Sequence, residues 1–266
     1  MQFFDTHAHI GLIDSDPIKQ IGVIQQAKRS GVTRIVSINN SLIDFKREYA
    51  LLKSQKGIYH AVGVGPSEVN SPGKEWAKTI EESASLANVV AIGETGLDYL
   101  KQYGDKRRQI ELFIAQLEIA QKVKLPVIIH NRNAGDDIFE ILQGRLPSKG
   151  AIFHCYSENA AYAHKCLDAG LNVYFSFAGN LTYRNARNLH ETVLALPPDR
   201  ILLETESPFM PPASYANAPN KQDRRTKPSY LLATARFLSE MLDVELEELS
   251  RQLWANSCRI FSLPKE

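Results

Sequence analysis

Eight short apolar runs, rich in β-branched and aromatic residues, recur along the sequence and alternate with longer stretches of helical spacing. The helical spacing is clearest in residues 107–124, where apolar side chains recur at i, i+3, i+4 and i+7. This pattern predicts a β-strand followed by an α-helix, eight times over. The predicted strands are residues 3–9, 34–39, 59–64, 89–94, 126–130, 151–154, 172–177 and 201–206.

Eight such units in 266 residues predict one α/β domain over residues 1–266, a (β/α)8 or TIM barrel, because its strands are all parallel and no sheet edge stays open. An open doubly wound sheet is the structural alternative. No Gly-x-Gly-x-x-Gly fingerprint follows the first strand, so dinucleotide binding is not expected. The Pro-rich stretch 207–227 is predicted to be an active-site loop, and the stretch 244–253 an extra C-terminal helix that packs against the barrel wall.

The charged residues nearly balance, with 31 Lys and Arg against 30 Asp and Glu, which excludes a strongly basic protein that coats a polyanion. A hydrophobic share of 44% excludes disorder. Three cysteines without a CxxC pair predict neither a disulfide framework nor a zinc ribbon, and they favour a reducing cytosol. The sequence shows no signal-peptide pattern and no apolar run of membrane-spanning length. We therefore expect a cytoplasmic protein, neither secreted nor membrane-embedded, and a monomer by default.

Residues that commonly bind metals occupy the ends of several predicted strands. His7 and His9 are two residues apart on the first strand, so both imidazoles point to the same face. Taken alone, such a pair is equally typical of two hydrogen-bonded histidines. The other candidates at strand ends are Glu94, His130, His154 and Glu206. All strands of a barrel open on one face, where barrel active sites lie, so these six side chains predict a catalytic metal site for zinc, manganese, iron or, less well, magnesium.

The remaining candidates are weaker. Cys155 adjoins His154, and strand alternation predicts that its thiol turns away and packs in the interior. The three other mid-chain histidines are expected to be surface or packing residues; they are His60, His164 and His190. Basic residues follow the fifth, seventh and eighth strands and are either solvated charges or phosphate contacts. The predicted substrate-binding residues among them are Arg132, Arg184 and Arg225.

Six short motifs distributed over the chain characterise it further. They are Asp5-Thr6-His7-Ala8-His9, Ile92-Gly93-Glu94-Thr95-Gly96-Leu97-Asp98-Tyr99, Pro126-Val127-Ile128-Ile129-His130 with Arg132, His154-Cys155-Tyr156-Ser157, Thr182-Tyr183-Arg184-Asn185-Ala186 and Leu203-Glu204-Thr205-Glu206-Ser207-Pro208. In these motifs, nearly end to end, the chain resembles the TatD family of metal-dependent deoxyribonucleases, within the amidohydrolase-like superfamily of barrels. The resemblance implies one metal ion on His7, His9, Glu94 and Glu206, and a second on Glu94, His130 and His154. Glu94 would then bridge the two ions.

Three positions depart from the family pattern. Glu204-Thr205-Glu206 replaces the usual Glu-Thr-Asp, which lengthens the second acid by one methylene. Gly63-Val64-Gly65-Pro66-Ser67 stands where the family usually has Gly-x-His-Pro, so an imidazole is missing. Lys227-Pro228 replaces the usual Glu-Pro.

The resemblance implies a divalent-metal-dependent phosphodiester hydrolase, a TatD-type deoxyribonuclease and exonuclease that acts on DNA or another phosphodiester. Two ions of zinc, manganese or magnesium would share a bridging hydroxide. Glu94 and Glu206 are the predicted catalytic residues, with Glu206 a metal ligand or proton acceptor. One alternative is a metal-dependent hydrolase of a small amide, ester or lactone, because a fold does not determine a substrate. A non-catalytic binding barrel is the other.

Overall fold

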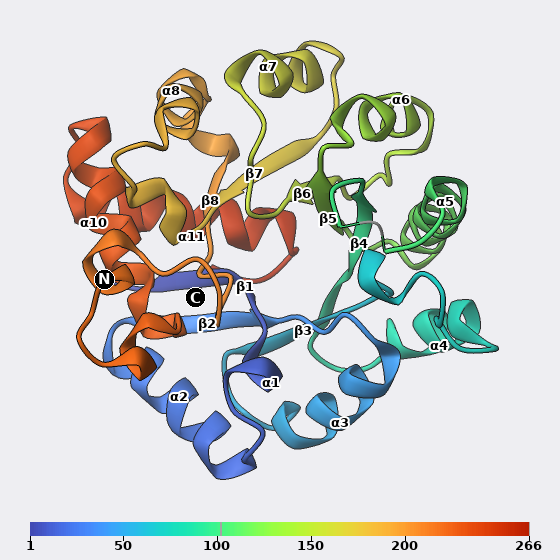
Figure 1. Cartoon of the computed structure of the whole chain (residues 1–266), viewed down its shortest axis with the longest axis horizontal. Helices are drawn as coiled ribbons and strands as arrows, with labels where there is room; N and C mark the ends of the chain where they lie inside the picture. Colours follow the sequence, from blue (N-terminus) through green and yellow to red (C-terminus); the bar gives the residue numbers. More distant parts are fainter. Residues whose placement is uncertain (102, 266) are drawn as a thin grey trace.

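Eight parallel strands pair in chain order, from β1 beside β2 through to β7 beside β8 (Figure 1). This computed structural model describes residues 1–101 and 103–265. The predicted (β/α)8 barrel is confirmed. The strands are β1 (Phe3–Ala8), β2 (Val32–Ser37), β3 (Ile58–Val62), β4 (Val89–Asp98), β5 (Val127–Arg132), β6 (Ala151–Phe153), β7 (Val173–Phe177) and β8 (Ile201–Leu203).

The helices surround this ring of strands (Figure 1). The predicted helix at 107–124 is α5, which begins after Asp105, whose side chain accepts a hydrogen bond from the backbone N–H of Arg107. No helix in the described part of the chain is long and apolar enough to cross a membrane. The α-helices are α1 (Ile10–Ile13), α2 (Pro17–Arg29), α3 (Leu42–Leu52), α4 (Trp76–Ser83), α5 (Lys106–Val123), α6 (Gly135–Arg145), α7 (Ala160–Asp168), α8 (Arg187–Ala195), α9 (Ala213–Ala216), α10 (Leu231–Leu242) and α11 (Leu246–Ile260).

The barrel closes between its first strand and the segment that follows its last one. The backbone N–H of Glu206 donates to the carbonyl oxygen of His7 (3.0 Å), and that of His9 donates to the carbonyl oxygen of Ser207 (2.8 Å). Ala8 and Ser207 form a parallel bridge between these two bonds. The closure therefore holds the two histidines of β1 beside the acid that follows β8.

Strands β4 and β5 approach closely because β4 contains glycines. Gly96 has a φ of +138°, and a Cβ atom there would overlap the carbonyl oxygen of His130. A Cβ atom on Gly63, at the end of β3, would lie 2.8 Å from the Cα atom of Gly93. Only glycine fits at such approaches. The same glycines bring the backbone of Glu94 beside the neighbouring strands, and β4 extends four residues past the predicted end at 94.

The extra C-terminal helix packs against the barrel wall, as predicted, and also covers one end of the barrel. Its Leu249 and Leu253 belong to the cluster that lies between the strands and the outer helices. The barrel interior contains Phe4, Ile128 and Tyr174, and Phe261, directly after α11, packs into the same cluster. The side-chain amide of Asn256 on α11 donates to the carbonyl oxygen of Ile201 at the start of β8 (2.8 Å). Helix α10 occupies the wall beside β8, next to α11 (Figure 1). The amphipathic pattern predicted the helix and its contact with the wall. It did not predict the contact of Phe261 with the barrel interior, because Phe261 lies beyond the predicted stretch 244–253.

The predicted loop 207–227 contains only two short helical segments, α9 and the 3-10 helix η4 (Lys221–Arg224). It folds back on itself, since the backbone N–H of Thr226 donates to the carbonyl oxygen of Pro208 (3.0 Å). Its Arg225 guanidinium donates to the carbonyl oxygen of Leu12 (2.8 Å), which connects the loop after β8 to helix α1.

A buried carboxyl group in α3 makes the stability of the fold depend on pH. Glu48 is 3% exposed and accepts a hydrogen bond from the Ser37 hydroxyl of β2. Burial raises the pKa of Glu48 from 4.5 to about 7, although the Ser37 hydrogen bond opposes the shift. The folded state therefore keeps this proton to a higher pH than the unfolded state. The resulting stability is fully present below pH 4.5 and is lost as the pH rises through 7.

We predict that Glu48→Gln removes this part of the pH dependence. Between pH 4.5 and pH 8, the free energy of unfolding of the variant should fall by about 3 kcal/mol less than that of the wild type. Urea denaturation of chelator-treated protein at both pH values measures the difference. Glu118→Gln on the exposed face of α5 is the matched control. Equal pH dependence in wild type and Glu48→Gln would contradict the assignment.

Candidate metal centre

A first group of side chains forms where β1 ends. The Nε2 atoms of His7 and His9 lie 3.2 Å apart. The Oε2 atom of Glu94 is 3.5 Å from the His7 nitrogen and 3.7 Å from the His9 nitrogen. Glu206 reaches the same two nitrogens with its two carboxylate oxygens, at 3.2 and 3.8 Å. Two imidazoles and two carboxylates thus converge on one point.

A second group shares Glu94 with the first. The Oε1 atom of Glu94 lies 2.7 Å from Nδ1 of His130 and 3.2 Å from Nε2 of His154. These two nitrogens are 3.2 Å apart. The two oxygens of one buried carboxylate therefore face two different pairs of imidazoles.

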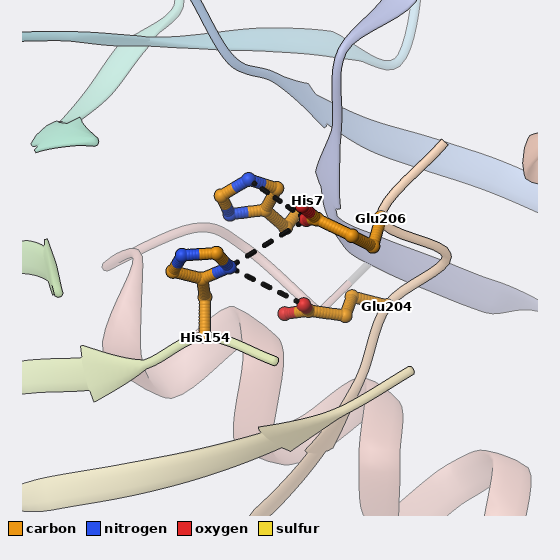
Figure 2. A group of neighbouring side chains, drawn as sticks. All are labelled: His7, His154, Glu204 and Glu206. Carbon is orange, nitrogen blue, oxygen red and sulfur yellow. Dashed lines mark ion pairs between the residues drawn. The ribbon is translucent and has the colours of Figure 1, made fainter. Parts of the chain in front are cut away.

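A third group of side chains connects the first group with the second (Figure 2). The rings of His7 and His154 stack, with centroids 4.1 Å apart and planes 12° apart. Figure 2 shows Glu206 reaching toward both rings from the segment after β8, while Glu204 from the same segment approaches the same nitrogen of His154 as Glu206 does. The Nδ1 atom of His154 is 3.5 Å from Glu206 and 3.6 Å from Glu204. His154 therefore presents one nitrogen to Glu94 and the other to these two acids.

Two acids that were not among the predicted site residues orient the imidazoles. Asp98 at the end of β4 contacts Nε2 of His130 (3.1 Å), which leaves Nδ1 of that ring turned toward Glu94. Glu204 is fully buried, and its Oε1 atom accepts a hydrogen bond from the backbone N–H of Cys155 (2.7 Å). Carboxylates behind a histidine commonly set its tautomer and orientation in metal sites. Both acids lie within the motifs named above. Glu204 is two residues from Glu206 and Asp98 is four residues from Glu94, and this closeness to ligand candidates is the sequence signal that could have identified them.

The charges of the centre stabilise one another. Burial by itself raises the pKa of Glu94, but the charge of His154 and hydrogen bonds from His130 and His154 outweigh it and hold this pKa well below its usual range. Burial also raises the pKa of Glu206, yet the charges of His7 and His154 lower it to about 2. Burial lowers the pKa of His154, whereas Glu94 and the other acids raise it well above its ordinary value. The carboxylates are therefore ionised, as metal ligands must be.

The residues present fit divalent cations. Ligand atoms about 2.0–2.2 Å from an ion lie roughly 3–3.5 Å apart, and both groups contain donor atoms 3.2 Å apart. The Oε2 atom of Glu206 is buried and makes no hydrogen bond, although Nε2 of His7 lies 3.2 Å and Nδ1 of His154 lies 3.5 Å away. A cation among these atoms would satisfy the buried carboxylate. Imidazole and carboxylate without thiolate is a donor set typical of catalytic rather than structural metal sites.

A cavity of about 440 Å³ opens beside the second group. Its wall includes His130, His154 and Glu206, together with Arg132, the last residue of β5. Arg184 and Arg225 are exposed and do not belong to the described wall of this cavity. The structure thus places one of the three predicted substrate-binding arginines at the centre, and all three assignments stay predictions.

Cys155 differs from the prediction. Cys155 is half-buried and lines the cavity rather than packing in the interior. A left-handed φ of 40° breaks the alternation of the strand on which the prediction depended. The three other histidines lie outside the ligand groups, as predicted. His60 is buried beside the rings of Phe45 and Tyr49, and His190 contacts the carbonyl oxygen of Leu181 (2.8 Å), whereas His164 is exposed.

Comparison with known proteins decides the family. The model of the family described as TatD related DNase matches residues 4–262. The chain belongs to this family. It is 34% identical to an uncharacterized metal-dependent hydrolase, YabD, of Bacillus subtilis (strain 168), over 98% of this chain and 99% of the relative. It is 31% identical to a protein named 3′-5′ ssDNA/RNA exonuclease TatD of Erwinia billingiae (strain Eb661), over 91% and 92% of the two chains.

A solved structure supports the assignment. The crystal structure of YJJV, a TatD homologue from Escherichia coli K12, superimposes with a TM-score of 0.86 at 26% identity and covers 98% of both chains. The expected TatD family membership and the expected metal-dependent hydrolase are therefore confirmed.

Of the three departures from the TatD pattern, Glu206 belongs to the centre itself. Glu206 has a left-handed φ of 55° and still reaches both histidines of β1. Beside Gly65, the side chain of Asn40 occupies the adjoining space, since a Cβ atom on Gly65 would lie 3.5 Å from its Oδ1 atom. Lys227 forms an ion pair with Asp223 of the same loop (3.4 Å).

We predict that Asp98→Asn weakens divalent metal binding about 10- to 100-fold, because the carboxylate that orients His130 is lost. Competition between the protein and a fluorescent chelator for Zn²⁺ or Mn²⁺ measures this affinity. Asp136→Asn, at an exposed position in the first turn of α6, is the matched control and keeps the wild-type affinity. An Asp98→Asn protein that binds metal as tightly as the wild type would rule out the orienting role.

Proposed function

We propose that this protein hydrolyses phosphodiester bonds of nucleic acid as a 3′-5′ exonuclease, with two divalent metal ions. The observation that carries the proposal is the position of Glu94, whose two carboxylate oxygens face two separate pairs of imidazoles. The activity named for the Erwinia billingiae relative supports the choice of substrate.

The ligands follow from the two groups. His7, His9 and Glu206 would hold one ion together with Glu94, and His130 and His154 would hold the other with the same carboxylate. Zinc, manganese and magnesium are the candidate metals. When bound, two such ions supply a hydroxide nucleophile at neutral pH and neutralise charge on the phosphoryl oxygens.

The protein's own residues orient the substrate and hold the ions. The guanidinium of Arg132 stands in the wall of the 440 Å³ cavity, where it pairs with a phosphate of the bound strand. Glu206 lines the same cavity, and the charges of His7 and His154 hold its pKa low. Its carboxylate therefore stays ionised, as a ligand of the first ion must be.

We also propose that the enzyme acts in the cytoplasm. Its three cysteines are all free thiols, as a reducing compartment maintains them.

The bridging role of Glu94 is tested by Glu94→Gln. The amide keeps the shape of the side chain but removes the charge that both ions would share, so we expect loss of bound metal and a decrease of at least 100-fold in cleavage of end-labelled single-stranded DNA. Plasma emission spectrometry and gel analysis, with and without chelator, measure the two effects on one sample. Glu191→Gln on the exposed face of α8 is the matched control.

Retention of metal and activity by Glu94→Gln would contradict the proposal. The substrate class is tested separately with the wild-type protein. Turnover of small esters, amides or lactones without cleavage of any oligonucleotide would contradict the nuclease proposal and identify the protein as a small-molecule hydrolase.

A further inference from the structure

Three half-exposed apolar side chains stand around the candidate metal centre. Leu12 lies in α1, directly after β1, Leu100 follows β4, and Phe209 follows β8, and the three are 49%, 50% and 50% exposed. All three belong to segments at the carboxyl ends of strands, the face on which the ligand candidates lie. We name these three residues the apolar rim.

Phe209 is held against one of the ligand candidates. Its ring stands edge to face with the ring of His9, with centroids 6.2 Å apart and planes 73° apart. Its backbone N–H donates to the carbonyl oxygen of Glu206 (2.7 Å) and closes a turn that fixes the ring beside the centre. Because half of the residue is exposed, the ring offers apolar surface to a molecule bound at the metals.

The two leucines of the rim line two separate hollows. The 440 Å³ cavity contains Leu100 together with His130 and His154 of the second group. A smaller cavity of about 190 Å³ contains Leu12 together with His9 of the first group. A substrate that spans the two groups therefore meets an apolar side chain in each hollow.

We propose that the apolar rim binds unpaired nucleobases on both sides of the scissile phosphodiester, and that Phe209 is the stacking residue that makes the enzyme prefer single strands. This inference rests on the proposed function. In a duplex the faces of the bases are already stacked on one another, and only their edges are accessible in the grooves. A single strand can turn a base face onto an aromatic ring. Arg132 in the larger hollow supplies a cation for a phosphate of the bound strand.

The test compares a normal strand with one that lacks a base. It measures kcat/KM of the metal-loaded enzyme on a single-stranded oligonucleotide that carries either an ordinary or an abasic nucleotide beside the scissile bond. We expect Phe209→Ala to lower kcat/KM on the intact strand on the order of 10-fold more than on the abasic strand, since stacking on an aromatic ring contributes about that much per base. An equal loss on both strands would overturn the proposal, because it would indicate damage to the turn at Glu206.

Further variants separate stacking from apolar bulk. Phe209→Trp should restore the advantage of the intact strand, whereas Phe209→Leu, which is apolar but not aromatic, should not. Leu194→Ala truncates another exposed apolar side chain, on the outer helix α8, and is the matched control with wild-type values. Full recovery by Phe209→Leu would overturn the stacking role.

A binding measurement distinguishes this inference from the proposed function. In chelator, fluorescence anisotropy of labelled strands should give a Kd about 10-fold lower for the intact than for the abasic strand in the wild type, and a ratio near one in Phe209→Ala. If the intact strand binds more tightly in this way but is not cleaved with any metal, the result would contradict the proposed nuclease activity and support base binding by the apolar rim. Cleavage by a wild type that treats intact and abasic strands alike would support the nuclease and overturn the rim.

Discussion

The carboxylate of Glu94 is the interaction on which the rest of the centre depends. It is 5% exposed and ionised, and each of its oxygens lies within 3.7 Å of two imidazole nitrogens. A buried carboxylate without partners would cost free energy of folding, so the fold must place the imidazoles beside it. The closure between β1 and the segment after β8 supplies one pair, and the glycine-dependent approach of β4 to β5 supplies His130 of the other. The contacts that close the barrel and bring its strands together therefore also position the imidazoles around this carboxylate.

Much of this arrangement can be predicted from the sequence. Alternation along β1 places His7 and His9 on one face, and the common opening of parallel strands brings the acids and histidines at other strand ends to the same place. These rules tolerate errors of a few residues, since β4 ends four residues later and β8 three residues earlier than predicted. His154 and Glu206 lie just beyond β6 and β8 and still converge with the rest.

Other features depend on tertiary contacts that periodicity does not describe. The left-handed φ of Cys155 turns its residue toward the cavity, against strand alternation. The amphipathic pattern predicted helix α11 and its contact with the wall, but it did not predict that Phe261, directly after this helix, packs into the barrel interior. Asp98 and Glu204 lie close in sequence to ligand candidates, but only the orientation of the His130 and His154 rings shows which nitrogen each acid contacts.

The central claim is that Glu94 lies between two metal ions. Anomalous diffraction from crystals loaded with Mn²⁺ or Zn²⁺ tests it most directly, because each ion gives its own peak. We predict two peaks per chain, one beside His7 and His9 and one beside His130 and His154, with an oxygen of Glu94 facing each. A single peak, or two peaks that Glu94 does not separate, would contradict the account.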